Sequence, residues 1–209
     1  MSNQGIREEK RVIMLDKIAE ICEQNHGIAK ASVLYEAGFD YRRLQSFVEE
    51  GRLLRVRNGY YQMARVSTDE EEIILGQFPD GVLTIGSALF YFGYLPSRPL
   101  QWSIAVDKNT SKSRFRMEYP VVVPYYTEPE VLSMGVTRIR FGEGEMKIYE
   151  KERLICDCLK YEEKLEREEL KAALRKFIDD PEKNIERLLT YAKERKVLSK
   201  VQNRIGVWM

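Results

Sequence analysis

Arginines are concentrated in one short stretch of this 209-residue chain, in numbers suited to binding nucleic acid. Residues 41–66 contain six arginines and two glutamates, a net charge of +4, whereas the whole chain carries only +1. Affinity for nucleic acid comes mainly from neutralised phosphates and released counterions, so local charge matters more than the average. An arginine can also bind a phosphate or a guanine through two parallel hydrogen bonds, where a lysine acts as a point charge. The stretch therefore predicts a nucleic-acid contact.

The residues around these arginines predict a helix-turn-helix. The apolar residues Val33 and Leu34 indicate a short helix, which Gly38 can end by adopting a positive φ. Asp40 is a suitable N-cap for a second helix, from Tyr41 to Glu50. The inward positions of that second helix are Leu44, Phe47 and Val48. Its outward positions, which could reach phosphates or base edges, are Arg42, Arg43, Gln45 and Ser46.

A basic β-hairpin follows at once. Residues 53–57 alternate as a strand, residues 60–63 pair back, and Asn58-Gly59 between them is the strongest short-range signal for a type I′ turn. Together with a preceding helix from Glu8 to Asn25, these elements predict a winged helix-turn-helix DNA-binding domain over residues 1–66. The expected core stripe of the preceding helix is Val12, Leu15, Ile18, Ala19 and Cys22. The alternative is a solvated amphipathic helix beside a basic hairpin with no role on DNA.

A second domain is expected over residues 67–209. It opens with the cap candidates Ser67 and Thr68, and residues 67–146 carry a net charge of −4, which makes a poor DNA surface. We expect a small mixed sheet over 82–149 and a bundle of helices over 151–203, so the predicted fold class is α+β. Arg153 and Asp157 stand four residues apart on a helix and predict an ion pair. Asp180-Pro181 predicts the start of the last helix, which runs to about Lys196.

Composition excludes several classes of protein. The 44% hydrophobic and 32% charged fractions are typical of a folded domain, and the longest uncharged run, 81–97, is too short and too interrupted for a membrane helix. The first residues lack an apolar signal region and three cysteines cannot all pair, which favours the reducing cytoplasm. A single histidine, His26, argues against triads and multi-histidine zinc sites. We expect no metal, no cofactor and no catalytic residue.

Three blocks of residues resemble the AbiEi family, the abortive-infection antitoxins of type IV toxin-antitoxin systems. The first block is the pattern of Gly27 to Gly38 with Leu44 and Gly51 to Tyr61. The second comprises Ser87, Ala88, Leu89, Gly93 and Leu95. The third comprises Tyr149, Glu152, Arg153, Asp157 and Leu159. The blocks span nearly the whole chain, and their order and spacing are more specific than any one of them.

The resemblance implies a DNA-binding autorepressor that binds inverted repeats in its own promoter, as a monomer or a DNA-dependent dimer. It also implies a C-terminal domain that counteracts a nucleotidyltransferase-like toxin, AbiEii, without necessarily forming a stable complex. The family's DNA contacts fall here on Tyr41, Arg42, Arg43, Gln45, Ser46, Arg55, Arg57 and Asn58, and the local charge adds Arg52. The hairpin tip is Arg-Asn-Gly where many relatives are more basic.

Two other functions stay open. A ligand-sensing regulator would bind a small molecule between the aromatic residues of the sheet domain, which are Tyr91, Phe92, Tyr94, Trp102, Tyr125 and Tyr126. A metal-dependent nuclease would hold magnesium through carboxylates, for which the candidates are Asp107, Glu118, Glu128 and Asp157. The polar segment 108–117 is either a mobile loop or a second nucleic-acid contact.

Overall fold

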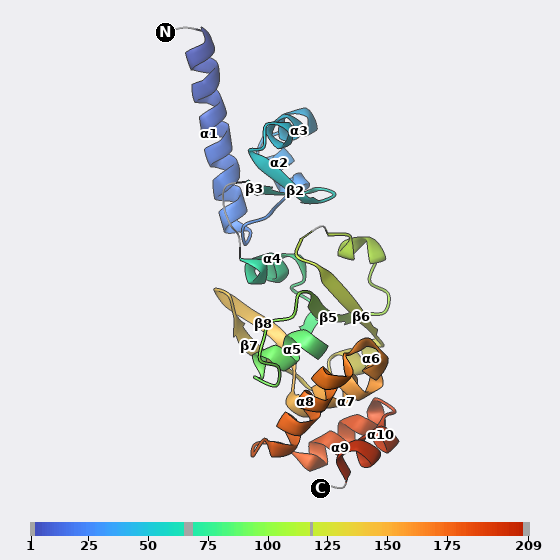
Figure 1. The fold of residues 1–209 in the computed structure, drawn as a ribbon. Coiled ribbons are helices and arrows are strands. Elements are labelled where there is room, and N and C mark those ends of the chain that lie inside the picture. The colour runs from blue at the N-terminus through green and yellow to red at the C-terminus, as the bar shows by residue number, and fades with distance from the viewer. Residues whose placement is uncertain (1–2, 65–68, 118, 207–209) are drawn as a thin grey trace. The chain divides into compact units, whose positions relative to one another are not determined.

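The computed structural model describes residues 3–64, 69–117 and 119–206, which form two compact units (Figure 1). The first unit is Met1–Pro79 with Arg116–Pro120 and Phe141–Gly144, and the second is Asp80–Phe115 with Val121–Arg140 and Glu145–Met209. The described residues contain both helices and two sheets, so the predicted α+β class is confirmed. The predicted domain boundary at residue 66 and the cap candidates Ser67 and Thr68 lie outside the described residues.

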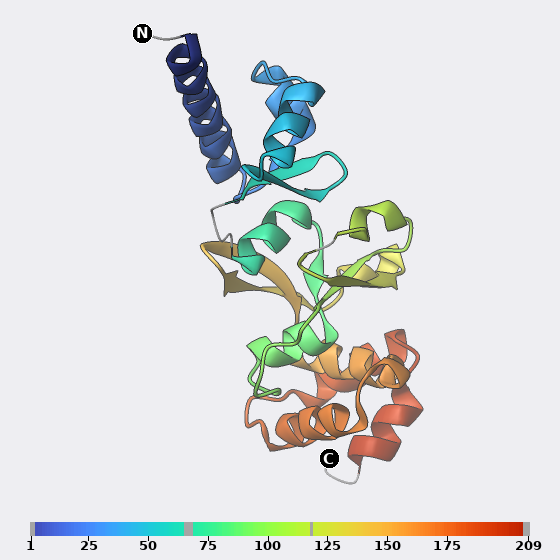
Figure 2. The same ribbon diagram turned by 45° about the horizontal axis from the view of Figure 1, so that its top comes forward.

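The first unit is built on a long helix and a three-stranded sheet. Its elements are α1 (Asn3–Gln24), β1 (Ala29–Lys30), α2 (Ala31–Glu36), α3 (Tyr41–Glu49), β2 (Leu53–Arg57), β3 (Tyr60–Met63) and α4 (Glu70–Gln77). The sheet is antiparallel with the strand order β1-β3-β2. The N-terminal turns of α1 extend beyond the neighbouring helices α2 and α3 (Figures 1 and 2).

One apolar cluster holds α1, α2 and α3 to the sheet of this unit. Ile18 and Cys22 of α1 are buried in it with side chains from α2, α3 and the strands. The predicted core stripe is wrong at Val12, which is 50% exposed. Among the described side chains of α1, Met14 is the first apolar one that lies partly buried against the cluster, and Val12 precedes it on the helix. Val12 and Ile13, which are 50% and 62% exposed, are accessible to solvent or to a partner.

The β2–β3 hairpin differs from its predicted form at the turn. Gly59 has a φ of 76°, whereas Asn58 does not have the positive φ that a type I′ turn requires at both central positions. The expected alternation also fails, because Leu53 and Val56 are both buried and the pairing register shifts between Arg55 and Arg57. A bulge of this kind increases the local right-handed twist of the hairpin.

The second unit contains the predicted mixed sheet. Its elements up to the sheet's end are β4 (Val82–Leu83), α5 (Ile85–Tyr91), β5 (Trp102–Asp107), a 3₁₀ turn (Lys112–Phe115), β6 (Val122–Thr127), α6 (Pro129–Leu132), β7 (Val136–Phe141) and β8 (Gly144–Tyr149). The strand order is β6-β5-β4-β8-β7. Strand β4 pairs antiparallel with β5 and parallel with β8, and β5 pairs parallel with β6, so the sheet is mixed as predicted.

Four helices complete this unit and gather into one bundle (Figure 2). They are α7 (Lys151–Lys160), α8 (Arg167–Asp179), α9 (Ile185–Glu194) and α10 (Leu198–Ile205). The predicted N-cap at Asp180 is wrong, because Asn184 caps α9 by accepting a hydrogen bond from the amide of Arg187 at 2.9 Å. Asp180 instead accepts a hydrogen bond from the Tyr94 hydroxyl at 2.6 Å and pairs with Lys151 at 2.8 Å. No helix in the described ranges has the length and apolar character needed to cross a membrane.

A buried ionic cluster joins α7 to α9. The carboxylate of Asp157 accepts hydrogen bonds from Nε of Arg153 at 3.2 Å and from Nε of Arg195 at 2.5 Å, and all three side chains are at most 2% exposed. Arg153 also donates to the carbonyl oxygens of Val131 and Met134, at 2.7 and 2.8 Å, which ties α7 to the chain between α6 and β7. The predicted Arg153–Asp157 pair is confirmed, and it is wholly buried. Burial alone would lower the pKa of Arg195, but Asp157 outweighs it and the pKa lies above its ordinary value.

Replacing Asp157 by asparagine should destabilise the second unit strongly. The substitution leaves two buried guanidinium groups without a counter-charge, and removing one partner of a buried pair costs about 3–5 kcal/mol. The free energy of unfolding in urea measures the loss. As a control, Asp179→Asn removes an exposed carboxylate of α8 and should change the free energy by no more than about 0.5 kcal/mol. Equal effects from the two substitutions would contradict the role of the cluster.

Candidate nucleic-acid interface

The turn between α2 and α3 sets the direction of α3. The backbone of Gly38 has a φ of 95°, a left-handed conformation in which any other residue would be strained. Phe39 then turns back into the apolar cluster, where it is 7% exposed. Asp40 caps α3, because its Oδ1 accepts a hydrogen bond from the amide of Arg43 at 2.8 Å. The predicted N-cap of this helix is therefore confirmed.

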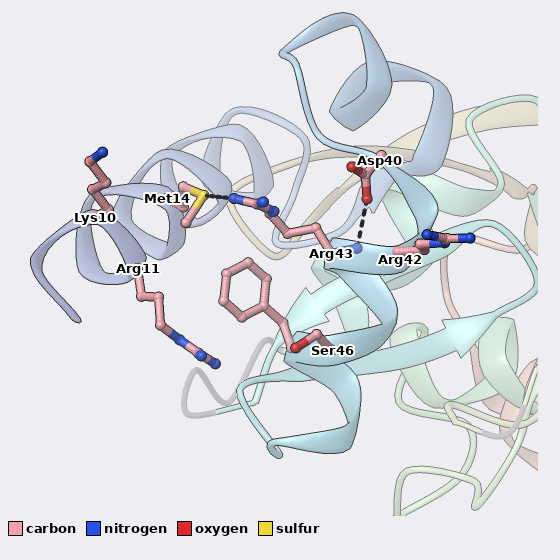
Figure 3. Close-up of a pocket in the computed structure, with 8 residues that line it drawn as sticks. Lys10, Arg11, Met14, Asp40, Arg42, Arg43 and Ser46 are labelled. Carbon is pink, nitrogen blue, oxygen red and sulfur yellow. Dashed lines mark hydrogen bonds between the residues drawn. The ribbon is translucent and has the colours of Figure 1, made fainter. Parts of the chain in front are cut away.

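Helix α3 buries one face and presents a basic face to solvent. Leu44 and Phe47 are buried at 0% and 2% exposure, and Tyr41 on the other side is 54% exposed. Arg42 and Arg43 are both exposed, but they point in different directions (Figure 3). Two adjacent helical residues lie about 100° apart around the axis, so both cannot serve the same contact.

The direction of Arg43 is set by α1. Its Nη1 lies 2.8 Å from the sulfur of Met14, toward which the whole side chain extends, while Arg42 points away from α1 (Figure 3). A thioether is a weak acceptor, so this contact leaves most of the donor capacity of Arg43 available. Arg43 is therefore directed at the space beside α1, and Arg42 is directed outward from α3.

Two other predicted contact residues on α3 form hydrogen bonds along the helix. The hydroxyl of Ser46 donates to Oε1 of Glu50 at 2.7 Å, and the amide nitrogen of Gln45 lies 3.5 Å from Oε1 of Glu49. Each of these bonds joins residues four apart, as is common on a helix surface. Gln45 and Ser46 would have to exchange these partners in order to contact DNA.

The hairpin holds its three predicted arginines in different environments. Arg55 donates to the side-chain oxygen of Asn58 at the turn, which brings two predicted contact residues together at the tip. The guanidinium of Arg57 stacks over the ring of Tyr60, with 3.9 Å between its central carbon and the ring centroid. Arg52 is half-buried at the start of β2. The hairpin tip is thus a preorganised, positively charged edge.

A groove between α1 and α3 contains cationic residues that the sequence analysis missed. Its volume is about 520 Å³ (Figure 3). The residues lining it are Lys10, Arg11, Met14, Asp40, Arg42, Arg43, Ser46 and Phe47. Lys10 stands one turn before Met14 and two turns before Ile18, so the stripe that is apolar in the core becomes basic where α1 leaves it. That change along one face was the signal available in the sequence.

An ion pair spans this groove. Arg11 donates to Glu50, and this bond, followed by the one from Ser46, lowers the pKa of Glu50 below its ordinary value. The carboxylate of Asp40 is occupied by the α3 cap. Among the residues lining the groove, Asp40 is the one acid and four are cationic, so the groove is a region of positive potential.

The described residues offer little support for thiol or metal chemistry. Burial raises the pKa of Cys22 to about 11 and that of Cys156 to about 12, and Cys158 is shifted upward as well, which keeps these thiols protonated and unreactive near neutral pH. Within the described ranges, no three His, Cys, Asp or Glu side chains are grouped so that they could hold a metal ion. His26 ends α1 with a φ of 56° and contacts Glu72, with 3.1 Å from Nδ1 to Oε2.

The carboxylates proposed for a nuclease are engaged in separate structural contacts. Asp107 accepts a hydrogen bond from the amide of Asn109 at 2.7 Å, and Glu128 forms an ion pair with Lys108. Asp157 lies inside the buried cluster with its two arginines, and Glu118 lies outside the described residues. The structure does not bring Asp107, Glu128 and Asp157 together as ligands of one ion.

The aromatic residues considered for ligand binding pack against one another. Trp102, Tyr94 and Tyr125 are 3–5% exposed. The rings form contacts with centroid distances of 6.4 Å for Tyr91 and Trp102, 6.2 Å for Phe92 and Tyr94, and 6.0 Å for Phe115 and Tyr126. Within the polar segment, residues 108–115 belong to the second unit, where Nη1 of Arg114 donates to Asp80 at 2.9 Å.

Comparison of the chain with protein-family models and with curated proteins finds no match.

Removing the α3 cap should weaken the first unit. Asp40→Ala leaves the amide of Arg43 without its acceptor, and loss of an N-cap of this type costs about 1 kcal/mol. The free energy of unfolding of the full chain, from urea titration, measures this effect. Asp40→Asn keeps a side-chain oxygen that can accept the same hydrogen bond, so its free energy should stay close to that of the wild type. A similar loss in both variants would contradict the capping role.

Proposed function

We propose that the protein is a sequence-specific double-stranded DNA-binding protein that docks α3 and the β2–β3 hairpin on its operator as a winged helix-turn-helix. The observation that carries the proposal is the solvent-facing surface of α3, where Tyr41, Arg42 and Arg43 stand on a capped helix whose other face is buried. An α-helix fits the major groove, where each base pair presents a distinct pattern of donors and acceptors.

The arrangement of elements supports this proposal. Helices α2 and α3 are joined by the four residues 37–40, which include Gly38, and such a glycine-containing turn is typical of a helix-turn-helix. The hairpin follows α3 in the chain and carries Arg55 and Arg57. In the proposed complex the hairpin contacts the sugar-phosphate backbone beside the groove that α3 enters, which fixes the register of the protein on the duplex.

The different directions of the two arginines suggest different roles. Arg42, which points away from α1, is proposed to read a base edge, because a guanidinium can bind O6 and N7 of guanine together. Arg43, which extends toward α1, is proposed to contact a phosphate. Gln45, Ser46, Arg52 and Asn58 complete the proposed contact surface from positions at its edges.

We further propose that the protein represses its own operon and acts in the cytoplasm, without catalysis, as the antitoxin of a type IV system. Support comes from the resemblance of the three sequence blocks to AbiEi antitoxins. The glycines of the first two blocks take backbone conformations that favour glycine, since Gly27, Gly38, Gly51 and Gly59 of the first block and Gly93 of the second all have positive φ. The proposed antagonist is an AbiEii-like nucleotidyltransferase toxin, against which residues beyond the DNA-binding unit would act. The operator would contain inverted repeats, occupied by two monomers or by a DNA-dependent dimer.

Arg42→Ala should reduce discrimination between the operator and other DNA. Loss of a bidentate base contact costs about 1–3 kcal/mol. Affinity is measured by fluorescence anisotropy for a duplex from the region upstream of the protein's own gene and for a shuffled duplex of the same composition. The loss should appear on the first duplex alone. Arg175→Ala, which removes an exposed arginine of α8, is the matched control and should leave both affinities unchanged. If Arg42→Ala binds each duplex with the same affinity as the wild type does, the proposed docking is refuted.

The two proposed activities should be separable. If the neighbouring reading frame encodes a nucleotidyltransferase, its expression alone should arrest growth, and co-expression of the wild-type chain should restore it. Arg42→Ala should restore growth equally well while failing to repress a reporter fused to the operon's promoter. Restoration of growth is read from colony counts and repression from reporter activity. If Arg42→Ala loses the restoration of growth to the same degree as it loses repression, the assignment of antitoxicity to residues outside the DNA-binding surface is contradicted.

A further inference from the structure

Among the described side chains on the N-terminal part of helix α1, Lys10 and Arg11 are cationic, and both precede the residues of this helix that are buried in the apolar cluster. Lys10 is exposed, and Arg11 is half-buried beside Glu50. Both line the groove whose opposite wall is α3, and Arg43 reaches into the same groove from that wall (Figure 3). Ile18 and Cys22 bury α1 further along the chain, so the core contacts of this helix do not involve Lys10, whereas Arg11 also lies over the ring of Phe47, 5.8 Å from its centroid. Lys10 and Arg11 lie beside the proposed DNA-reading helix, and a role in binding accounts for this position.

We propose that Lys10 and Arg11 form a phosphate clamp that binds the DNA backbone along α3, and that Glu50 acts as an intramolecular competitor for Arg11. The proposal rests on the proposed DNA-binding function and extends it to α1. A helix seated in the major groove, about 12 Å wide, has a phosphate backbone on each side. The hairpin would meet one backbone, and the cations of α1, with Arg43, would meet the other.

The chemistry of the groove suits phosphate. Lys10 offers an ammonium point charge, which binds phosphate without demanding one orientation, whereas Arg11 and Arg43 can each offer two parallel donors. Arg43 would give up the sulfur of Met14, which is a weak acceptor. Arg11 has a carboxylate partner, and its exchange from Glu50 to a phosphate replaces one anion by another. The contact would be independent of base sequence, because phosphates carry no sequence information.

Glu50 therefore weakens DNA binding in this account. Its carboxylate accepts hydrogen bonds from both Arg11 and Ser46, each of which lines the groove. Glu50→Gln removes the negative charge while keeping an acceptor oxygen for Ser46. It should release Arg11 for phosphate and raise the affinity for any duplex.

The test is the salt dependence of binding to a mixed-sequence duplex, measured by fluorescence anisotropy with the full-length chain. Each phosphate contact contributes a slope of about −0.9 to the logarithm of affinity against the logarithm of salt concentration. Lys10→Gln should make the slope shallower by about one contact. Glu50→Gln should raise the affinity, because Arg11 then binds a phosphate without leaving a carboxylate, and should keep the slope close to that of the wild type. Lys193→Gln makes the same change of charge at an exposed residue of α9. It should change neither the affinity nor the slope.

The outcomes separate this inference from the function on which it rests. If Lys10→Gln keeps the wild-type slope and Glu50→Gln keeps the wild-type affinity while Arg42→Ala loses operator discrimination, the clamp is refuted and DNA binding by α3 stands. If the wild-type chain binds no duplex in dilute salt, both proposals are refuted. If Lys10→Gln keeps its slope on the duplex but loses binding to polyglutamate, the groove takes an acidic protein partner and the phosphate clamp is refuted. Thermal unfolding of each variant, unchanged from wild type, excludes misfolding as the cause.

Discussion

The burial of Leu44 and Phe47 is the constraint on which the proposed interface depends. These side chains lie three residues apart on α3, so they occupy one face, and their burial at 0% and 2% exposure fixes the rotation of the helix about its axis. Because the rotation is fixed, the side chains of Arg42 and Arg43 face solvent. The cap by Asp40 fixes where the helix starts, and the core contacts of Ile18 fix where α1 passes it. A change in any of these would redirect the arginines without altering their charge.

The second unit uses its charged residues differently. Asp157, Arg153 and Arg195 are fully enclosed, so their role is to hold α7, α9 and the segment after α6 in one arrangement. Breaking such a cluster is costly, but replacing it by apolar residues is often not, which suggests a role in specifying the packing. Arg153 and Asp157 belong to a sequence block that resembles AbiEi antitoxins. Their burial means that this block carries information about the fold, and that the proposed antitoxin activity would have to depend on exposed residues.

The sequence predicted features that depend on local chemistry and missed those that depend on distant neighbours. Asp40 as a cap and Gly38 at positive φ were predictable because each acts on the adjacent backbone. Asp180 carried an equally good capping signal, but Lys151 and Tyr94 bind its carboxylate, and these partners come from remote parts of the chain.

The same reasoning explains the parts of the candidate site that were missed. The turn type of the hairpin was wrong because the bulge at Val56 follows from burying both that residue and Leu53 in clusters formed by several elements. The direction of Arg43 depends on the position of Met14, which lies 29 residues away on another helix. The contribution of Lys10 could be inferred only from a face that changes from apolar to basic.

Hydrogen exchange of the full chain, with and without a duplex from its own upstream region, tests the central claim most directly. We predict slower exchange of backbone amides in α3 and the β2–β3 hairpin when the duplex is present, with unchanged exchange over residues 145–206. Protection confined to the second unit, with none in α3 or the hairpin, would contradict the account.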